Sequence, residues 1–161
     1  MRGLDSVLLV PQKVIHLKRG GGSLMMYRCT LVFNMAATGG AVLIVDDEAP
    51  LRLALKHKLE SEGFETLQAK DGQEALDIAL REHPDIILLD LLMPVMDGFA
   101  VLKTLRADSW GRSAVVIALT NLSENEQVAD LLEFGVYEYI VKADWKIEDV
   151  VAKVKEKLKI P

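Results

Sequence analysis

Residues 86–98 read Ile86-Ile87-Leu88-Leu89-Asp90-Leu91-Leu92-Met93-Pro94-Val95-Met96-Asp97-Gly98. The apolar run at the start is typical of a strand that is buried on both faces, as in the centre of a parallel sheet. Asp90 ends that run, and Pro94 and Asp97-Gly98 predict a turn, because Pro lacks an N–H and Gly tolerates positive φ. An apolar strand that presents a carboxylate at its carboxyl end indicates an open α/β sheet displaying a reactive group.

The same pattern of strand and helix repeats on both sides of this stretch. Strands are predicted at 41–45, 64–69, 86–90, 114–119 and 136–141. Helices are predicted from Pro50 to Gly63, from Asp71 to Pro84, over 98–106, from Ser123 to Gly135 and from Asp144 to Lys159. This alternation predicts an α/β fold of five βα units, with a parallel sheet, right-handed crossovers and helices on both faces.

Helix starts and apolar faces can also be predicted. Asp71-x-x-Glu74 and Ser123-x-x-Glu126 are typical of capping boxes, and Asp144 is expected to cap the last helix. Apolar residues at helical spacing indicate the inward faces. These are Ala75, Leu76, Ala79 and Leu80 in the second helix, Val128, Leu131 and Leu132 in the fourth, and Ile147, Val150, Val151, Val154 and Leu158 in the fifth.

Composition limits the class of protein. The 161 residues are half hydrophobic, which suits one domain with a real core. Cys29 is the only cysteine, so no internal disulfide can form, and we expect a reducing, cytoplasmic location. The net charge of −5 argues against general nucleic-acid binding. The apolar run 24–37 is interrupted by Arg28 and Asn34 and is shorter than the about 20 residues of a membrane span.

Residues 1–40 differ from the remainder of the chain. They carry five basic side chains against one acidic one, and Gly20-Gly21-Gly22-Ser23 and Gly39-Gly40 have the composition of flexible linkers. Our main interpretation is a poorly ordered leader, or a start codon assigned too far upstream, because termini are ordered only when something ties them down. The alternative is a short strand or helix that docks on the domain, which we expect to span 41–161.

Polar side chains follow the carboxyl ends of four predicted strands: Asp46 and Asp47, Asp90, Thr120, and Lys142. In a parallel sheet these ends meet at one edge. Carboxylates brought together there need compensating cations, and oxygen ligands suit Mg²⁺. A lysine ammonium suits a phosphate oxygen. The set predicts a site at which Asp90 attacks a phosphoryl group and becomes an aspartyl phosphate.

Taken singly, each of these residues has a plainer interpretation. Asp46-Asp47 could be a helix N-cap pair, Thr120 a helix cap, Asp90 a strand end and Lys142 a surface lysine. Their common position at strand ends favours the functional interpretation.

Residues 41–159 resemble the receiver domain of two-component response regulators. The resemblance rests on the acid pair Asp46-Asp47, the motif from Asp90 to Gly98, Thr120 and Lys142. It implies a flavodoxin-like sheet of strand order 2-1-3-4-5. It also implies that Asp90 accepts phosphate from a histidine kinase and that Asp47, Asp90 and the Leu92 carbonyl bind Mg²⁺, with Asp46 holding a metal-bound water. Tyr139 matches the aromatic switch residue that turns inward when Thr120 moves toward the phosphate.

The sequence departs from the family pattern near the site. Ala143 follows Lys142 where the family usually has Pro after a cis bond, so we expect a trans bond here. Asn121 replaces a usually small residue, and Leu92 and Leu122 are apolar neighbours of the site. Together these residues lead to the hypothesis that the phosphoryl group on Asp90 is hydrolysed slowly.

We therefore expect a stand-alone receiver that is not an enzyme beyond catalysing its own phosphorylation and dephosphorylation. Its output would be phosphorylation-dependent binding of a target protein through the face of helix four, strand five and helix five. The alternative is a phosphorelay intermediate that passes phosphate to a histidine phosphotransfer protein. A phosphatase is disfavoured because Asp90 is followed by Leu91-Leu92 and so does not begin the nucleophile motif Asp-x-Asp-x-Thr of that family. A DNA-binding regulator is disfavoured because no residues remain for a helix-turn-helix.

Overall fold

The computed structural model describes residues 39–120, 128–136, 138–143 and 145–160. Strands and helices alternate along them, and a short 3₁₀ helix precedes the fourth strand. The strands are β1 (Ala41–Val45), β2 (Glu65–Ala69), β3 (Ile86–Asp90), β4 (Val116–Thr120) and β5 (Glu138–Val141). The helices are α1 (Ala49–Ser61), α2 (Gly72–Glu82), α3 (Gly98–Ala107), η1 (Gly111–Ser113), α4 (Val128–Glu133) and α5 (Ile147–Leu158).

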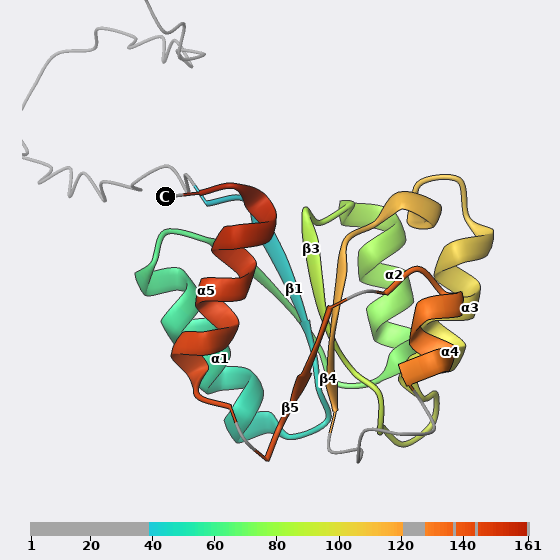
Figure 1. The fold of residues 1–161 in the computed structure, drawn as a ribbon, viewed down its shortest axis with the longest axis horizontal. Helices are drawn as coiled ribbons and strands as arrows, with labels where there is room; N and C mark the ends of the chain where they lie inside the picture. Colours follow the sequence, from blue (N-terminus) through green and yellow to red (C-terminus); the bar gives the residue numbers. More distant parts are fainter. Residues whose placement is uncertain (1–38, 121–127, 137, 144, 161) are drawn as a thin grey trace, which may run out of the picture. The chain divides into compact units, whose positions relative to one another are not determined.

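The five strands form one parallel sheet in the order β2-β1-β3-β4-β5, so the predicted strand order is confirmed. Helices α1 and α5 cover one face of the sheet, and α2, α3 and α4 cover the other (Figure 1). Strand β3, which contains Asp90, lies at the centre of the sheet and is buried along its whole length, as its apolar run predicts.

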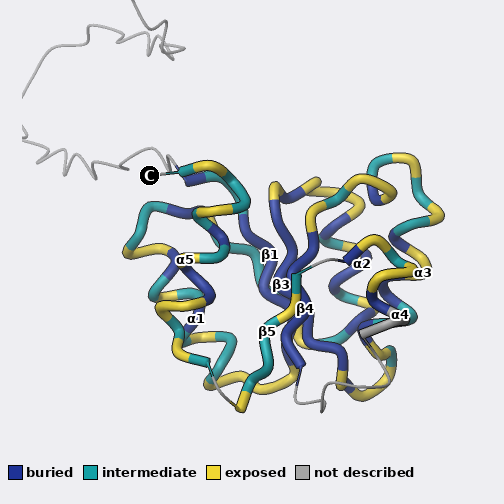
Figure 2. Tube along the Cα trace, viewed as in Figure 1, coloured by how far each residue is buried: buried dark blue, intermediate teal, exposed yellow. Residues whose placement is uncertain are grey.

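Two apolar cores flank the sheet because successive side chains of a strand point to opposite faces. Val42 and Ile44 of β1 join the core beneath α1 and α5, whereas Leu43 and Val45 join the core beneath α2 and α3. Figure 2 shows β1, β3 and β4 buried between the two helix layers, with the edge strand β5 partly exposed. This alternation decides on which side of the sheet each residue at a strand end emerges.

The N-cap of α2 is the predicted one, and α3 has a cap of the same kind, at Asp97, that was not predicted. Asp71 Oδ1 accepts the N–H of Glu74 at 2.9 Å, and Asp97 Oδ1 accepts that of Ala100 at 2.7 Å. Glu74 differs slightly from a capping box, because its carboxylate accepts the N–H of Lys70 rather than that of Asp71.

Two residues predicted to point inward do not. Leu80 is 37% exposed and Leu132 is 49% exposed, so the apolar stripes of α2 and α4 are narrower than the sequence indicates. Leu131, Val150, Val151 and Val154 are buried as predicted.

Strands β4 and β5 begin two residues later than predicted, and Arg106 accounts for much of the difference. Its guanidinium donates to the carbonyl oxygens of Phe134 at 2.7 Å, Gly111 at 2.6 Å and Ala114 at 3.1 Å. Ala114 is thereby held at the end of η1. Val136 donates its N–H to Leu131 O at 2.9 Å and so completes the end of α4 instead of opening a strand.

Several predictions concern residues outside the described ranges or at their ends. The leader 1–38, the Ser123-x-x-Glu126 box and Asp144 lie outside them. Helix α5 begins at Ile147, and its N-cap N–H, from Lys146, is accepted by Asp149 Oδ2 at 2.9 Å. No cis peptide bond occurs in the described ranges, so the bond between Lys142 and Ala143 is trans as expected. Within the same ranges, every helix is too short or too polar to cross a membrane.

Candidate functional site

Strand pairing brings the predicted site residues to the same edge of the sheet. Val45 of β1 lies opposite Leu89 of β3, so the residues that follow, Asp46 and Asp90, are neighbours. On the other side of β4, the N–H of Lys142 donates to Thr120 O at 2.7 Å and extends the β4–β5 ladder by one residue. The site is thus fixed by regular backbone pairing rather than by long loops.

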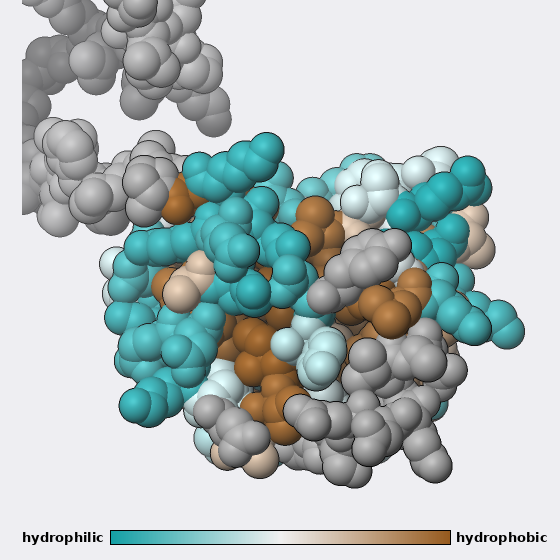
Figure 3. Space-filling view, viewed as in Figure 1, coloured by the Kyte–Doolittle hydropathy of each residue, from teal (hydrophilic) through white to brown (hydrophobic). Residues whose placement is uncertain are grey.

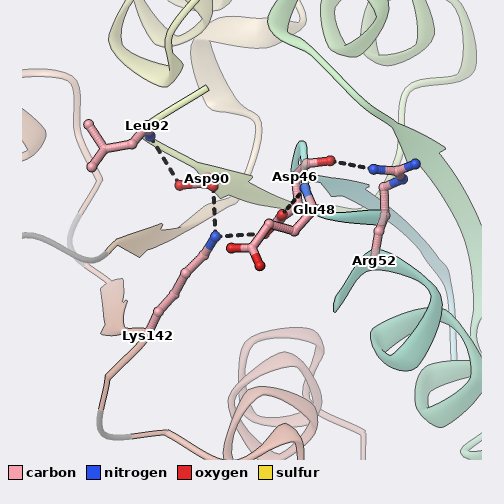
Figure 4. A network of polar contacts seen from close by, with 6 residues as sticks. All are labelled: Asp46, Glu48, Arg52, Asp90, Leu92 and Lys142. Atoms are coloured by element: carbon pink, nitrogen blue, oxygen red, sulfur yellow. Dashed lines mark hydrogen bonds and ion pairs between the residues drawn. The ribbon is translucent and has the colours of Figure 1, made fainter. Parts of the chain in front are cut away.

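Lys142 links the two buried carboxylates. Its Nζ lies 2.7 Å from Asp46 Oδ2 and 2.7 Å from Asp90 Oδ2, with only 5% of its side chain exposed (Figure 4). Alternation along the strands explains the meeting, because Asp46, Asp90 and Lys142 continue the series of residues that face α1 and α5. The ammonium is therefore a built-in counter-ion for the site.

The other oxygens of the two carboxylates accept backbone N–H groups. Asp90 Oδ1 accepts that of Leu92 at 3.0 Å, and Asp46 Oδ1 accepts that of Glu48 at 2.8 Å. Asp46 is fully buried and Asp90 is 3% exposed. These bonds fix the orientation of both carboxylates before any ligand binds.

Burial and charge act against each other at this site. Burial raises the pKa of the Asp90 carboxyl, and the hydrogen bonds from Lys142 and Leu92 lower it without cancelling that effect. Burial disfavours the charged Lys142 ammonium, but its hydrogen bonds to Asp46 and Asp90 and the attraction of their charges together outweigh burial and leave its pKa raised. Lys142 thus stays protonated, while Asp90 is charged at a cost.

The carboxylates form a group that could hold a metal ion. One oxygen from each of Asp46, Asp47 and Asp90 lies within 4.8 Å of the others, and Asp47 is exposed to solvent. A donor set of carboxylate oxygens with one open side suits Mg²⁺, which keeps several waters. The Leu92 carbonyl as a further ligand stays a prediction, although the N–H of Leu92 already places this residue beside Asp90.

Thr120 and Tyr139 emerge on the opposite side of the sheet from the two aspartates. They alternate with Leu119 and Ile140, which belong to or pack on the core beneath α1 and α5. Thr120 is 4% exposed, and Tyr139 is 37% exposed on the edge strand β5. Their assignment as a switch pair stays a prediction.

Arg52 is a neighbour of the site that sequence reasoning missed. Its Nη1 donates to the backbone carbonyl oxygen of Asp46 at 2.6 Å. The available signal was its place on the first turns of α1, since helical side chains lean back toward the N-terminus. An arginine so placed reaches back to the end of β1.

A doubly wound parallel sheet with clustered aspartates and a buried lysine beyond its strand ends agrees with the resemblance to receiver domains. The family model of the response regulator receiver domain matches residues 42–155. The chain belongs to this family.

Individual relatives agree with this assignment. A probable transcriptional regulator, ycf27, of Porphyridium aerugineum is 43% identical over 101 residues, which are 63% of this chain and 41% of that protein. The chain thus spans less than half the length of this curated relative.

Solved structures share the fold. The signal receiver domain of a signal transduction histidine kinase from Syntrophus aciditrophicus is 37% identical with a TM-score of 0.68, and the match covers 74% of this chain and 90% of that one. The receiver domain of the sensor histidine kinase PA1611 from Pseudomonas aeruginosa is 27% identical with a TM-score of 0.68, covering 75% and 98%. That structure has a magnesium ion coordinated in its active-site cleft.

Proposed function

We propose that this receiver accepts a phosphoryl group on Asp90 from a histidine kinase in a Mg²⁺-dependent reaction. The observation that carries the proposal is the position of Lys142 Nζ, 2.7 Å from oxygens of both Asp46 and Asp90. A buried ammonium that joins two carboxylates beside an open acidic edge is suited to an incoming phosphate.

The chemistry requires one displacement at phosphorus. An Asp90 oxygen attacks, the new P–O bond forms, the P–N bond to the donor imidazole breaks, and the imidazole leaves. Lys142 moves its contact from Asp90 to a phosphoryl oxygen, while Thr120 offers a hydroxyl to another. Asp47, Asp90 and the Leu92 carbonyl would hold Mg²⁺, with Asp46 holding one of its waters, and the ion would supply charge neutralisation for the phosphoryl oxygens.

The output we propose is phosphorylation-dependent binding of a target protein to the face formed by α4, β5 and α5. Figure 3 views this face and shows exposed hydrophobic residues between α5 and α4, over β5. Leu132 and Tyr139 contribute to it, being 49% and 37% exposed. We infer a cytoplasmic protein that catalyses only its own phosphorylation and dephosphorylation and has no direct contact with nucleic acid through this domain.

The alternative is a phosphorelay intermediate that passes phosphate from Asp90 to a histidine phosphotransfer protein. The observation in its favour is that the Syntrophus aciditrophicus and Pseudomonas aeruginosa relatives are receivers of histidine kinases. A transfer assay from the phosphorylated chain to candidate histidine proteins separates the two roles.

Labelling with radioactive acetyl phosphate, with and without Mg²⁺, tests the proposed acceptor. We expect stable incorporation into the wild type with Mg²⁺ and none into Asp90→Asn. Asp97→Asn is the matched control, because it removes a carboxylate from the same loop and Asn still caps α3. Full labelling of Asp90→Asn would refute the assignment.

A further inference from the structure

Arg52 contacts the site without belonging to its carboxylates or its lysine. It is half-buried on α1, where its N–H donates to Glu48 O at 3.0 Å, and its Nη1 donates to Asp46 O at 2.6 Å. Figure 4 shows the Arg52 guanidinium and the Lys142 ammonium approaching Asp46 from different directions. The side chain therefore braces the turn between β1 and α1.

Every polar atom of Asp46 has a partner, and Arg52 supplies one of them. The N–H of Asp46 donates to Ala69 O at 3.2 Å, and its two carboxylate oxygens accept from Glu48 and Lys142 at 2.8 and 2.7 Å. The carbonyl oxygen accepts from Arg52. Because Asp46 is fully buried, losing the guanidinium would leave this carbonyl without its side-chain donor in a place that water reaches poorly.

The orientation of that carbonyl also sets the direction of Asp47. The carbonyl of Asp46 and the N–H of Asp47 belong to one planar peptide unit, so fixing one fixes the other. Asp47 is exposed, and within the described part of the chain its side chain makes no hydrogen bond or ion pair. An oxygen of its carboxylate lies within 4.8 Å of one from Asp90, and among the described residues only the backbone that carries Asp47 holds it there.

We propose that Arg52 is a positioning residue for the metal site: it holds the Asp46–Asp47 peptide so that the Asp47 carboxylate lies where a divalent cation needs it. The inference rests on the proposed function, because it takes the acidic edge as a Mg²⁺ site. It assigns Arg52 no contact with the ion or the phosphoryl group.

Simple electrostatics makes the opposite prediction, which allows a clear test. A guanidinium near a divalent cation repels it, so removing Arg52 would tighten metal binding if charge alone mattered. Positioning predicts weaker binding when Arg52 is removed. The sign of the change in dissociation constant therefore separates the two explanations.

The experiment titrates the full chain with Mn²⁺ and measures the free ion by electron paramagnetic resonance, with Mg²⁺ as competitor. Arg52→Met keeps most of the aliphatic stem and removes the donor. We expect its dissociation constant to rise about tenfold, as is typical for groups that orient metal ligands. Lys56→Met is the control, since it removes a charge one turn further along α1, where Lys56 lies 3.7 Å from Glu60 and has no other ion pair among the described residues. Its constant should stay within about twofold.

Arg52→Lys keeps the charge on a stem that is one bond shorter, and circular dichroism shows whether each variant is folded. We expect Arg52→Lys to bind several-fold more weakly than the wild type, whereas charge alone predicts no change. Binding by Arg52→Met as tight as or tighter than the wild type overturns the proposal, and if that variant does not fold, wild-type affinity in Arg52→Lys does so. A wild type that binds no Mn²⁺ refutes the metal site itself and the role of Arg52 with it.

Discussion

Asp90 carries its charge in surroundings that disfavour it. Burial raises its pKa, so the folded chain holds this proton more tightly than the unfolded chain, and ionised Asp90 costs stability at neutral pH. We expect Asp90→Asn to raise the free energy of unfolding by about 1 kcal/mol in urea titrations at pH 7 with EDTA. Lys142 keeps Asp46 as its partner in this variant. Asp77→Asn, on the exposed side of α2, should change little, and a less stable Asp90→Asn would contradict the prediction.

The backbone of the loop after Asp90 is strained at Val95. Its φ is 71°, and the N–H of Met96 donates to Pro94 O at 2.8 Å, which closes a γ-turn. A β-branched residue rarely adopts this conformation, and Val95 is 91% exposed, so its side chain gains little from packing. Asn tolerates positive φ, and we expect Val95→Asn to stabilise the fold by about 1 kcal/mol in urea titrations. Val115→Asn, at ordinary φ, should give no gain; equal gains in both variants would exclude strain as the cause.

Leu92 bears on how long the proposed phosphoryl group on Asp90 would survive. Leu92 is 50% exposed, and its N–H donates to Asp90 Oδ1, so an apolar residue lies at the rim of the site. It offers an attacking water no hydrogen bond. We expect Leu92→Asn to hydrolyse the aspartyl phosphate about fivefold faster, which corresponds to one added hydrogen bond. Decay of the radiolabel measures it, with Val95→Asn as control in the same loop. A lifetime of seconds that Leu92→Asn leaves unchanged would refute the hypothesis of slow hydrolysis.

At the scale of elements, periodicity predicted the strands and helices well and their edges less well. The apolar run of β3 and the helical spacing in α5 each reflect burial, which the residues themselves determine. The starts of β4 and β5 depend on Arg106, whose three carbonyl partners come from separate segments. The spacing of apolar residues along the chain does not predict such contacts between separate segments.

Ion pairs join β5 to α5 through Glu138. Its carboxylate lies 2.7 Å from Lys157 Nζ and 2.9 Å from Lys153 Nζ, and the hydrogen bonds from Lys157 and then Lys153 lower its pKa. A lowered carboxyl pKa gives stability that is present above the ordinary pKa of Glu and is lost as the pH falls through the lowered value. We expect Glu138→Gln to cost about 0.5–1 kcal/mol at pH 7 and to match the wild type in strong acid. Urea titrations at both pH values measure it, with the more exposed Glu156→Gln as control. A cost independent of pH would show that packing, not charge, is responsible.

At the scale of the molecule, much of the candidate site could be predicted because parallel strands end together. Asp46, Asp90 and Lys142 follow or end three strands of the sheet, each at an alternate position that faces α1 and α5. The sequence and the strand order together specify these positions. Arg52 could not be found in this way. Its contact is with a backbone carbonyl, which no residue type along the chain identifies, and only its place on the first turns of α1 indicated that it could reach the end of β1.

Communication across the sheet is the property to test on the whole molecule. Phosphorylation at Asp90 is expected to draw Thr120 toward the phosphoryl group and free space for Tyr139. A two-state shift should therefore appear at β5 and its neighbours and not at the opposite edge of the sheet, at β2. We expect the rate of amide hydrogen exchange to change in peptides from α4, β5 and the start of α5 once acetyl phosphate and Mg²⁺ are added. The rate in α2 should stay the same. Thr120→Ala should keep the radiolabel on Asp90 and lose most of this response, because the hydroxyl that couples the two faces is absent. Tyr139→Phe keeps the ring and should retain the response. A response that survives in Thr120→Ala, or one that spreads equally to α2, would show that phosphorylation reaches the surface by another route.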